Sequence, residues 1–416
     1  MPRVGIRRVC AGLGSRRVEP MNEPTVLFAI FQTGSKANGG VESITQVIEG
    51  LRGLRKVVLT QAETPVNRRW RAAGAEVIVW DLPGSGWGDK KPSRLGRLLG
   101  YARSNLKAWR LIGAKGVDVV HCNYALPFAH IGYGAHWRGR PLVLNFRDTK
   151  ADDEPLPIKR YRSWFRKSAV VLVLSQEMAA YYRRVIPKQA DGQDESGYAE
   201  VRHIYSIVEL DRMLPATEQE RSASRRSWGI DDRAIAVGYV ATFNDKKNQL
   251  GFIEQAGPAL KRSSLPIKVY CFGDFDVERN EYARRCLETR DRLGLGDTVL
   301  FKGYTPAMRE VYHAMDMTVV PTRKEGMARC MIESMASGLP VVSFDVCSAR
   351  EILEGHGCGV VVRQQDYAGL VDGVLRLAGD SELRRAYAQA GRAAAESLYL
   401  RDHVVGAYGR LYEGLT

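Results

Sequence analysis

Residues 321–345 read PTRKEGMARCMIESMASGLPVVSFD, and this stretch predicts a strand, a turn, a helix and a second strand. The apolar residues 318–320 come directly before it, and Glu325-Gly326 form the turn into a helix that runs to Gly338. The apolar residues 341–344 then predict a strand that is buried on both faces. Two such strands joined by a helix are parallel and have a right-handed crossover. The stretch therefore predicts an α/β fold.

The same alternation of strand and helix fills the rest of the chain. The first buried strand is followed by a glycine-bearing loop and by a helix that starts near Val41. Strands are predicted at 25–31, 56–60, 76–80, 117–121, 141–146 and 170–175, and in a second series at 234–240, 267–272, 298–302, 318–320, 341–344 and 359–362. Two such series predict two doubly wound Rossmann-like domains that face each other across a cleft. Ligands of such folds bind at the carboxyl ends of the strands.

The length also favours two domains, because 416 residues exceed the about 250–300 over which a single core grows. Met21 comes just before the first strand, so the basic segment ahead of it is interpreted as a disordered leader or a mis-assigned start. We divide the chain into a leader (1–20), an N-terminal domain (21–210), a linker (211–231), a C-terminal domain (232–396) and a helix that returns to the N-terminal domain (397–416).

Composition excludes several classes of protein. The seven cysteines are scattered without a C-x-x-C pair, which argues against a zinc site. The sequence has no run of about 18 apolar residues, which argues against an integral membrane protein. The 61 Lys and Arg against 47 Asp and Glu give a net charge of +14 and favour polyanionic partners. Because no nucleic-acid-binding motif accompanies this charge, nucleic acid is not expected among them.

Two carboxylates stand at either end of a predicted phosphate site. The start of the helix after Gly326 offers unpaired N–H groups at residues 326–329, which suit a phosphate. Glu325 precedes this helix and Glu333 lies inside it, eight positions later. Carboxylates beside a phosphate site are best explained as acceptors for hydroxyl groups, one set on a sugar and one on a ribose. The alternative is that Glu325 caps the helix and Glu333 is a solvated surface residue.

This pattern resembles the E-x7-E signature of the family 4 (group 1) retaining glycosyltransferases, which have the GT-B fold. The resemblance covers roughly residues 24–414. It includes Pro340-Val341-Val342, the Gly357-x-Gly359 turn, Gly39-Gly40-Val41-Glu42, the strand end 118–121, residues 173–175, and the segment 204–215. It implies a retaining hexosyl transfer from a nucleotide-diphosphate sugar, UDP or GDP, with the N-terminal domain on the acceptor side and the C-terminal domain binding the nucleotide sugar. The basic stretches described below favour a glycan or lipid-linked acceptor of polysaccharide and cell-envelope biosynthesis.

The resemblance also implies roles for particular residues. Glu325 corresponds to the acceptor for donor-sugar hydroxyls near the reacting carbon, and Lys247 to the lysine that neutralises the leaving diphosphate; these are the catalytic candidates. Glu333 corresponds to the ribose-binding residue, and Tyr304 lies where the family binds the base. The further candidates for binding the diphosphate are Gly39, Gly40, Lys246, Gly326, Met327, Ala328 and Arg329.

Several positions depart from the family pattern. The family usually has an arginine where Thr242 stands, and often a glycine where Ala328 stands. On the acceptor side, Arg147-Asp148 replace a frequent His-Asp pair and Asn123 replaces a common histidine, so these three are the acceptor-side candidates. The departures also permit a catalytically inactive nucleotide-sugar-binding partner. A rival from another enzyme class is a GT-B nucleotide-sugar epimerase, which would resemble a different set of motifs and require extra catalytic carboxylates.

The absent arginine leads to a specific hypothesis. Arg329 lies at the start of the phosphate-binding helix, where its side chain leans back toward the helix N-terminus. It could therefore supply the second positive charge that Thr242 cannot, with Lys246 as the competing candidate. Alternatively, Arg329 points to solvent or pairs with a nearby carboxylate.

Neither a metal nor a cofactor is expected. Positive charge from Lys247 and from a helix N-terminus can stabilise a leaving diphosphate while the sugar carbon gains oxocarbenium character. The acidic pair Asp274-Phe275-Asp276 follows a C-domain strand, and we interpret it as a turn rather than as metal ligands.

Two basic stretches suggest a location for the protein. Residues 93–112 have leucines, an alanine and a tryptophan on one helical face and five basic residues elsewhere, and 158–167 add five basic residues among three aromatic ones. Such stretches can lie on an anionic membrane. We therefore expect a cytoplasmic protein, peripheral on the inner face of the membrane. The alternative is that 93–112 packs on the sheet and its basic face is simply solvated.

Overall fold

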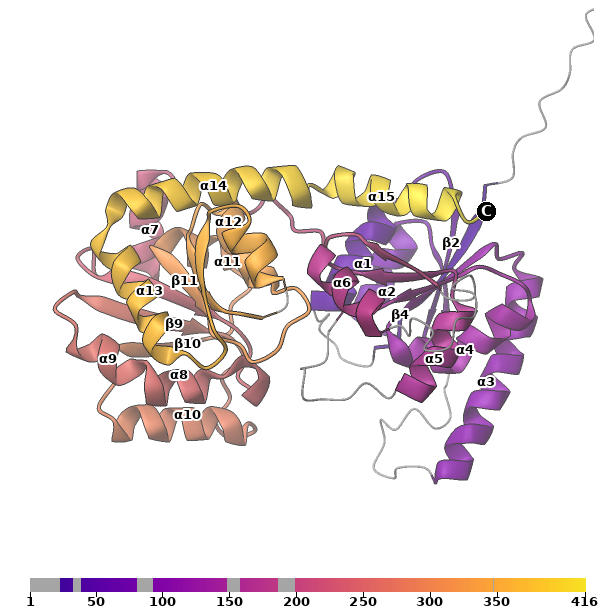
Figure 1. The fold of residues 1–416 in the computed structure, drawn as a ribbon, viewed down its shortest axis with the longest axis horizontal. Helices are drawn as coiled ribbons and strands as arrows, with labels where there is room; N and C mark the ends of the chain where they lie inside the picture. Colours follow the sequence, from indigo (N-terminus) through magenta and orange to yellow (C-terminus); the bar gives the residue numbers. More distant parts are fainter. Residues whose placement is uncertain (1–22, 33–38, 81–92, 148–157, 186–198, 347) are drawn as a thin grey trace, which may run out of the picture.

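The computed structural model describes residues 23–32, 39–80, 93–147, 158–185, 199–346 and 348–416. They form two α/β domains, each built on one parallel sheet with helices on both faces (Figure 1). The predicted fold class, two doubly wound Rossmann-like domains facing each other, is confirmed. The Asp148 candidate lies outside the described residues.

In the described residues the N-terminal sheet has seven strands, in the order β3-β2-β1-β4-β5-β6-β7. Phe28 at its centre is fully buried and pairs in register with Val58 on one side and His121 on the other. The direction of winding reverses between β1 and β4, which is where such sheets bind ligands. The strands are β1 (Thr25–Ala29), β2 (Arg55–Thr60), β3 (Glu76–Val79), β4 (Val119–Asn123), β5 (Leu142–Asn145), β6 (Val170–Val173) and β7 (Glu200–His203).

The described part of the C-terminal domain forms a sheet of six strands, in the order β10-β9-β8-β11-β12-β13. Its winding reverses between β8 and β11, so the loops that follow these two strands meet at the second switch point. The strands are β8 (Ile235–Val240), β9 (Ile267–Phe272), β10 (Val299–Gly303), β11 (Met317–Val320), β12 (Val341–Phe344) and β13 (Gly359–Val362).

Helices cover both sheets. The N-terminal domain contains α1 (Gly39–Gly50), α2 (Pro65–Ala72), α3 (Arg94–Ala114), α4 (Ala125–Trp137), α5 (Ile158–Lys167) and α6 (Gln176–Val185). The C-terminal domain contains α7 (Glu218–Trp228), α8 (Gln249–Gln255), α9 (Gly257–Arg262), α10 (Glu281–Arg292), α11 (Met308–Ala314), α12 (Arg329–Ala336) and α13 (Tyr367–Gly379). In the described part of the chain, none of the helices is both long enough and apolar enough to span a bilayer.

Two further helices connect the domains at the end of the chain. α14 (Ser381–Tyr399) packs on α12 and α13, and α15 (Arg401–Glu413) packs on α1, so together they bridge both domains (Figure 1). Tyr408, Leu411 and Tyr412 of α15 are buried in the N-terminal core. The hydroxyl of Tyr412 lies 3.0 Å from Nδ1 of His121 on β4.

Every predicted strand is present to within a few residues, and β7 is additional. The sequence predicted an irregular segment up to Glu200 because β7 is an edge strand and, of its four residues, only Val201 is buried. An edge strand exposes most of its side chains, so it lacks the continuous apolar run that identified the central strands.

The segment 211–231, assigned from sequence to a linker, contains α7, which packs on α11 of the C-terminal domain. A capping box fixes its start, since Thr217 Oγ1 accepts from the Glu220 N–H at 3.2 Å and the Glu220 carboxylate accepts from the Thr217 N–H at 2.9 Å. Arg221 then binds Asp316 at 2.6 Å. The connection between the domains is therefore shorter than the sequence suggested.

We expect Thr217→Ala to lower the free energy of unfolding by about 1 kcal/mol, because it removes this N-cap. Chemical denaturation followed by circular dichroism measures the change. Ser222→Ala in the middle of the same helix is the matched control and leaves the cap intact. Equal stability of Thr217→Ala and the wild type would show that the cap contributes nothing.

Candidate functional site

The switch point of the C-terminal sheet brings together the two predicted catalytic residues. Lys247 lies in the loop after β8 and Glu325 in the loop after β11, and the Nζ of Lys247 donates to Oε1 of Glu325 in an ion pair. Their side chains are 23% and 9% exposed. The sequence named both residues but did not predict that they pair, since 78 positions separate them.

Backbone contacts hold these two loops together. The N–H of Arg323 donates to the carbonyl oxygen of Lys246 at 2.9 Å, and Nδ2 of Asn248 donates to the carbonyl oxygen of Pro321 at 2.8 Å. Arg323 also binds Asp245 at 3.0 Å. The position of the Lys247–Glu325 pair is thus set by backbone hydrogen bonds as well as by the side chains.

A short 3-10 turn, Asp245–Lys247, orients the lysine. Asn244 caps this turn by accepting from the Lys247 N–H at 3.0 Å, and the buried hydroxyl of Tyr239 donates to the Lys247 carbonyl oxygen. Asn248 follows in a left-handed conformation with φ 65°, which asparagine tolerates better than most residues. The turn therefore presents Lys247 toward the loop after β11.

The start of α12 suits an anion. Met327 and Ala328 are buried, and no side chain in the described residues caps the helix at Ala328. Glu325 does not cap this helix, so the alternative interpretation of Glu325 as a cap is wrong: its carboxylate pairs with Lys247 instead. The N–H groups of the first turn of α12 therefore stay candidates for binding a phosphate.

Arg329 and Glu333 lie together on α12. Glu333 is 15% exposed, so it is not a solvated surface residue; it accepts from the Tyr312 hydroxyl at 2.9 Å and lies 3.5 Å from Nε of Arg329. A Cβ on Gly39 would lie 3.1 Å from Cδ of Arg329, so this side chain reaches the start of α1 in the other domain. Nη1 of Arg329 is buried and has no hydrogen-bond partner among the described residues.

The start of α1 carries the predicted glycines. Gly39 and Gly40 are its first two residues, and Gly39 faces Arg329. Glu42 of α1 accepts from Arg69 of α2 at 2.7 Å and from Gln46, one turn further along α1, at 3.0 Å. Burial raises the pKa of Glu42, but the hydrogen bond and charge of Arg69 outweigh this and leave the pKa below its usual value.

Other predicted donor residues are spread along the sheet. Tyr304 follows the edge strand β10, two strands away from β8, and is 58% exposed. Lys246 and Thr242 are exposed in the loop after β8. Gly326 is buried, and its carbonyl oxygen lies 3.0 Å from Oγ of Ser348. The structure thus brings together Lys247, Glu325 and the start of α12, while Tyr304 stands apart from them.

The acceptor-side candidates lie at the ends of β4 and β5. Asn123 pairs in register with Asn145, and its Oδ1 is buried without a partner among the described residues. Arg147 reaches Ser206 at 3.4 Å. His121 next to them has its pKa lowered to about 3, chiefly by burial and also by the charge of Arg147, so its imidazole is neutral. His121, buried and hydrogen-bonded to Tyr412, is therefore part of the packed core.

Sequence reasoning missed a set of contacts between the domains. Glu351, in the turn after β12, accepts from the N–H groups of Gln176 and Glu177 at 3.1 and 2.8 Å, at the start of α6. Glu177 in turn accepts from the N–H of Ser348 at 2.7 Å. Each carboxylate therefore caps a turn of the opposite domain. The Ser175-x-Glu177 pattern after β6 was an N-cap signal, but nothing in it identified the partner.

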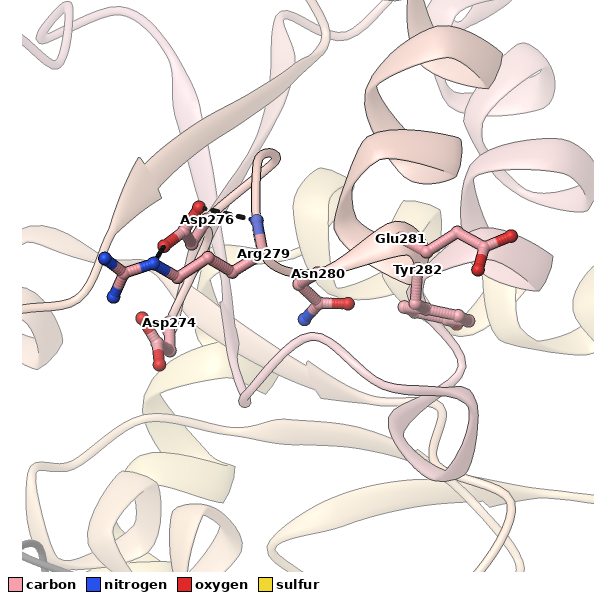
Figure 2. A pocket seen from close by; sticks show the side chains of 6 residues that line it. All are labelled: Asp274, Asp276, Arg279, Asn280, Glu281 and Tyr282. Carbon is pink, nitrogen blue, oxygen red and sulfur yellow. Dashed lines mark hydrogen bonds and ion pairs between the residues drawn. The ribbon is translucent and has the colours of Figure 1, made fainter. Parts of the chain in front are cut away.

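The acidic pair Asp274 and Asp276 lines a hollow of about 600 Å³ beside the loop after β9 (Figure 2). Asp276 accepts from the N–H groups of Glu278 and Arg279 at 3.0 and 3.1 Å, so it stabilises a turn, and Asn280 caps α10. Among the described residues, no group of three or more acidic, histidine or cysteine side chains is placed to hold a metal ion.

The two domains match two family models. Residues 38–191 match a glycosyl transferase 4-like domain, and residues 234–380 match the group 1 glycosyl transferases. A glycosyltransferase from Rickettsia africae has a similar structure over 95% of this chain and 99% of its own, with 16% identity and a TM-score of 0.77. Anabaena HepE, solved with UDP and glucose, is similar over 93% and 99%, with 17% identity and a TM-score of 0.73.

A sequence relative is the D-inositol 3-phosphate glycosyltransferase of Corynebacterium urealyticum, 24% identical over 47% of this chain and 48% of its own. The matched region spans about half the length of the first curated relatives. The fold and the switch-point loops define a two-domain GT-B protein. Within that class, the chain belongs to the group 1 (family 4) glycosyltransferases.

Proposed function

We propose that this protein is a retaining hexosyltransferase, which moves a sugar from a UDP- or GDP-sugar to a glycan or lipid-linked acceptor in cell-envelope biosynthesis. The observation that carries the proposal is the Lys247–Glu325 ion pair at the switch point of the C-terminal sheet. Relatives support the donor class, since HepE was solved with UDP-glucose. The name of the Corynebacterium relative supports sugar transfer.

The pair explains how the donor would bind. In the free protein the two charges neutralise each other, so neither is left alone in a largely buried site. A diphosphate carries more negative charge than one carboxylate, and we propose that it takes Lys247 from Glu325. The carboxylate of Glu325 is then available to accept hydrogen bonds from sugar hydroxyls.

The transfer step follows from this arrangement. The bond between the anomeric carbon and the diphosphate oxygen breaks, and its electron pair goes to the diphosphate. An acceptor hydroxyl attacks from the same face, and its proton passes to the departing phosphate oxygen. Lys247, Arg329 and the start of α12 stabilise the developing negative charge, and we propose that they suffice without a metal ion.

Ligand-dependent thermal shifts test the donor class. We expect a UDP- or GDP-sugar at 100 times its dissociation constant to stabilise the protein by about 2.7 kcal/mol, and the matching nucleoside monophosphate to stabilise it less. Addition of an acceptor should then release nucleoside diphosphate and give a product with the donor's anomeric configuration by NMR. Binding without release would favour the inactive partner. Absence of a shift with every nucleotide sugar would refute the proposal.

A further inference from the structure

The α3 helix turns its apolar face outward. Leu95, Leu98 and Leu99 are 67%, 65% and 63% exposed, and Leu106 is 48% exposed. The alternative that this apolar face packs on the sheet is therefore wrong. The residues that α3 buries are instead Gly100, Ser104, Asn105, Ala108 and Ile112.

Polar contacts fix this orientation. Ser104 Oγ lies 2.9 Å from Nδ1 of His130 on α4, and Nδ2 of Asn105 donates to the carbonyl oxygen of Ala129 at 2.9 Å. Oδ1 of Asn105 accepts from the N–H of Gly134 at 2.9 Å. A Cβ on Gly134 would lie 2.4 Å from the carbonyl oxygen of Asn105, so the two helices touch at that point. Rotating the leucines inward would break these contacts.

An apolar groove of about 420 Å³ lies beside the leucines, between α3, α4 and α5. Its wall includes two aromatic residues of α4, of which Trp137 is 54% exposed. Its apolar and aromatic lining includes Leu98, Tyr101, Ala129, Tyr133, Trp137 and Trp164. The exposed leucines and the neighbouring aromatic groove form one apolar surface. Such a surface on a folded protein usually marks a site that binds a partner or a membrane.

The charge of the helix identifies the partner. α3 contains no acidic residue, and its five basic residues, Arg94, Arg97, Arg103, Lys107 and Arg110, are all exposed. At 100° per residue, Arg103, Lys107 and Arg110 follow one border of the leucine face. Leucines bordered by basic residues are typical of helices that lie in the interface of an anionic bilayer.

The groove also lies on the acceptor side of the domain. α3, α4 and α5 each start after the carboxyl end of a strand, β3, β4 and β5. Asn123 and Arg147 lie at this same carboxyl end of the strands. A bilayer against α3 would therefore present its lipids near the acceptor-side residues.

We propose that the leucine face of α3 and the adjoining groove form a surface that inserts into an anionic lipid bilayer. The leucines and Trp137 enter the acyl-chain boundary, and the arginines bind lipid phosphates. With the transfer proposed above, on which this step rests, the acceptor is then lipid-linked rather than a free glycan.

Co-sedimentation with vesicles of phosphatidylglycerol and phosphatidylcholine, or of phosphatidylcholine alone, tests this surface. We expect the protein to bind the anionic vesicles at least about tenfold more tightly. The variant Leu95→Ser/Leu98→Ser/Leu99→Ser should weaken that binding at least about tenfold, and it should still fold because these side chains are exposed. Arg103→Glu/Lys107→Glu/Arg110→Glu, which reverses the charge along the border of the leucine face, should weaken it similarly.

The matched control makes the same change in net charge on a different helix. Arg284→Glu/Arg285→Glu/Arg292→Glu places it on exposed positions of α10 in the C-terminal domain and should leave vesicle binding at the wild-type level. Equal binding to both vesicle types, an unaffected leucine variant, or an equal loss in the α10 control would overturn the proposal. Thermal shifts by nucleotide sugars on the same proteins keep the two proposals separate, because vesicle binding does not depend on donor binding.

Discussion

Replacement of Lys247 by methionine is expected to slow sugar transfer by about 10²–10³-fold, because it removes a positive charge from the leaving diphosphate. Glu325→Gln should cost a similar factor, since the carboxylate that accepts the sugar hydroxyls becomes a weaker acceptor. Both effects should appear in kcat at saturating donor, where binding is complete. Turnover close to that of the wild type in either variant would remove that residue from the mechanism.

Stability needs a separate measurement in these variants. Each single change leaves one charge of a largely buried pair without its partner, which can destabilise a protein by up to about 3–5 kcal/mol. The double variant Lys247→Met/Glu325→Gln removes both charges, so it should melt at a higher temperature than Lys247→Met while remaining as inactive. Lys261→Met on α9, on the outer side of the C-terminal domain, controls for loss of a lysine and should keep full activity (Figure 1).

The fold was largely predictable from the sequence because its central strands are buried on both faces. Strands such as β1 and β12 are mostly apolar and buried at every residue, and their alternation with helices indicates parallel sheets. β7 was not predicted because only one of its residues, Val201, is buried. α7 was assigned to a linker because its composition is polar, although the Thr217-x-x-Glu220 capping box was present in the sequence.

The candidate site was predictable only as separate residues. Lys247 follows β8 and Glu325 follows β11. Their loops meet because these two strands are neighbours in the sheet, and the sequence alone does not give that strand order. The reciprocal caps of Glu177 and Glu351 depend in the same way on how the two domains dock. For α3, periodicity identified the apolar face but left open whether the sheet or a membrane covers it. The buried contacts of Ser104 and Asn105 with α4 decide that the leucines face outward.

The missing arginine leads to the second prediction, which concerns Arg329. Arg329→Met is expected to weaken binding of the nucleoside diphosphate by about 10–100-fold and to affect the monophosphate much less, since a charge-assisted hydrogen bond contributes about 1.5–3 kcal/mol. The pairing with Glu333 that the sequence left open is present, with Nε of Arg329 3.5 Å from Oε1 of Glu333. Nη1 has no partner among the described residues and lies on a side chain that reaches Gly39.

Isothermal titration with the diphosphate and the monophosphate measures this difference, and Arg323→Met serves as the matched control. Arg323 lies in the same loop, but its guanidinium is paired with Asp245, so its loss should weaken both nucleotides equally or neither. Lys246→Met tests the competing candidate: a larger diphosphate-specific loss there than in Arg329→Met would assign the charge to Lys246. If Arg329→Met weakens both nucleotides to the same degree, Arg329 does not contact the second phosphate.

Thr242→Arg in the Arg329→Met protein tests whether positions 242 and 329 bind the same phosphate. Thr242 is exposed in the loop after β8, so an arginine fits there without displacing core residues. We expect it to restore at least about tenfold of the lost diphosphate affinity, because it returns a guanidinium to the position where the family usually has one. Restoration specific to the diphosphate would mean that the two positions serve one phosphate clamp. An arginine at Thr242 that improves the wild type and the Arg329→Met variant by the same factor would mean that they act independently.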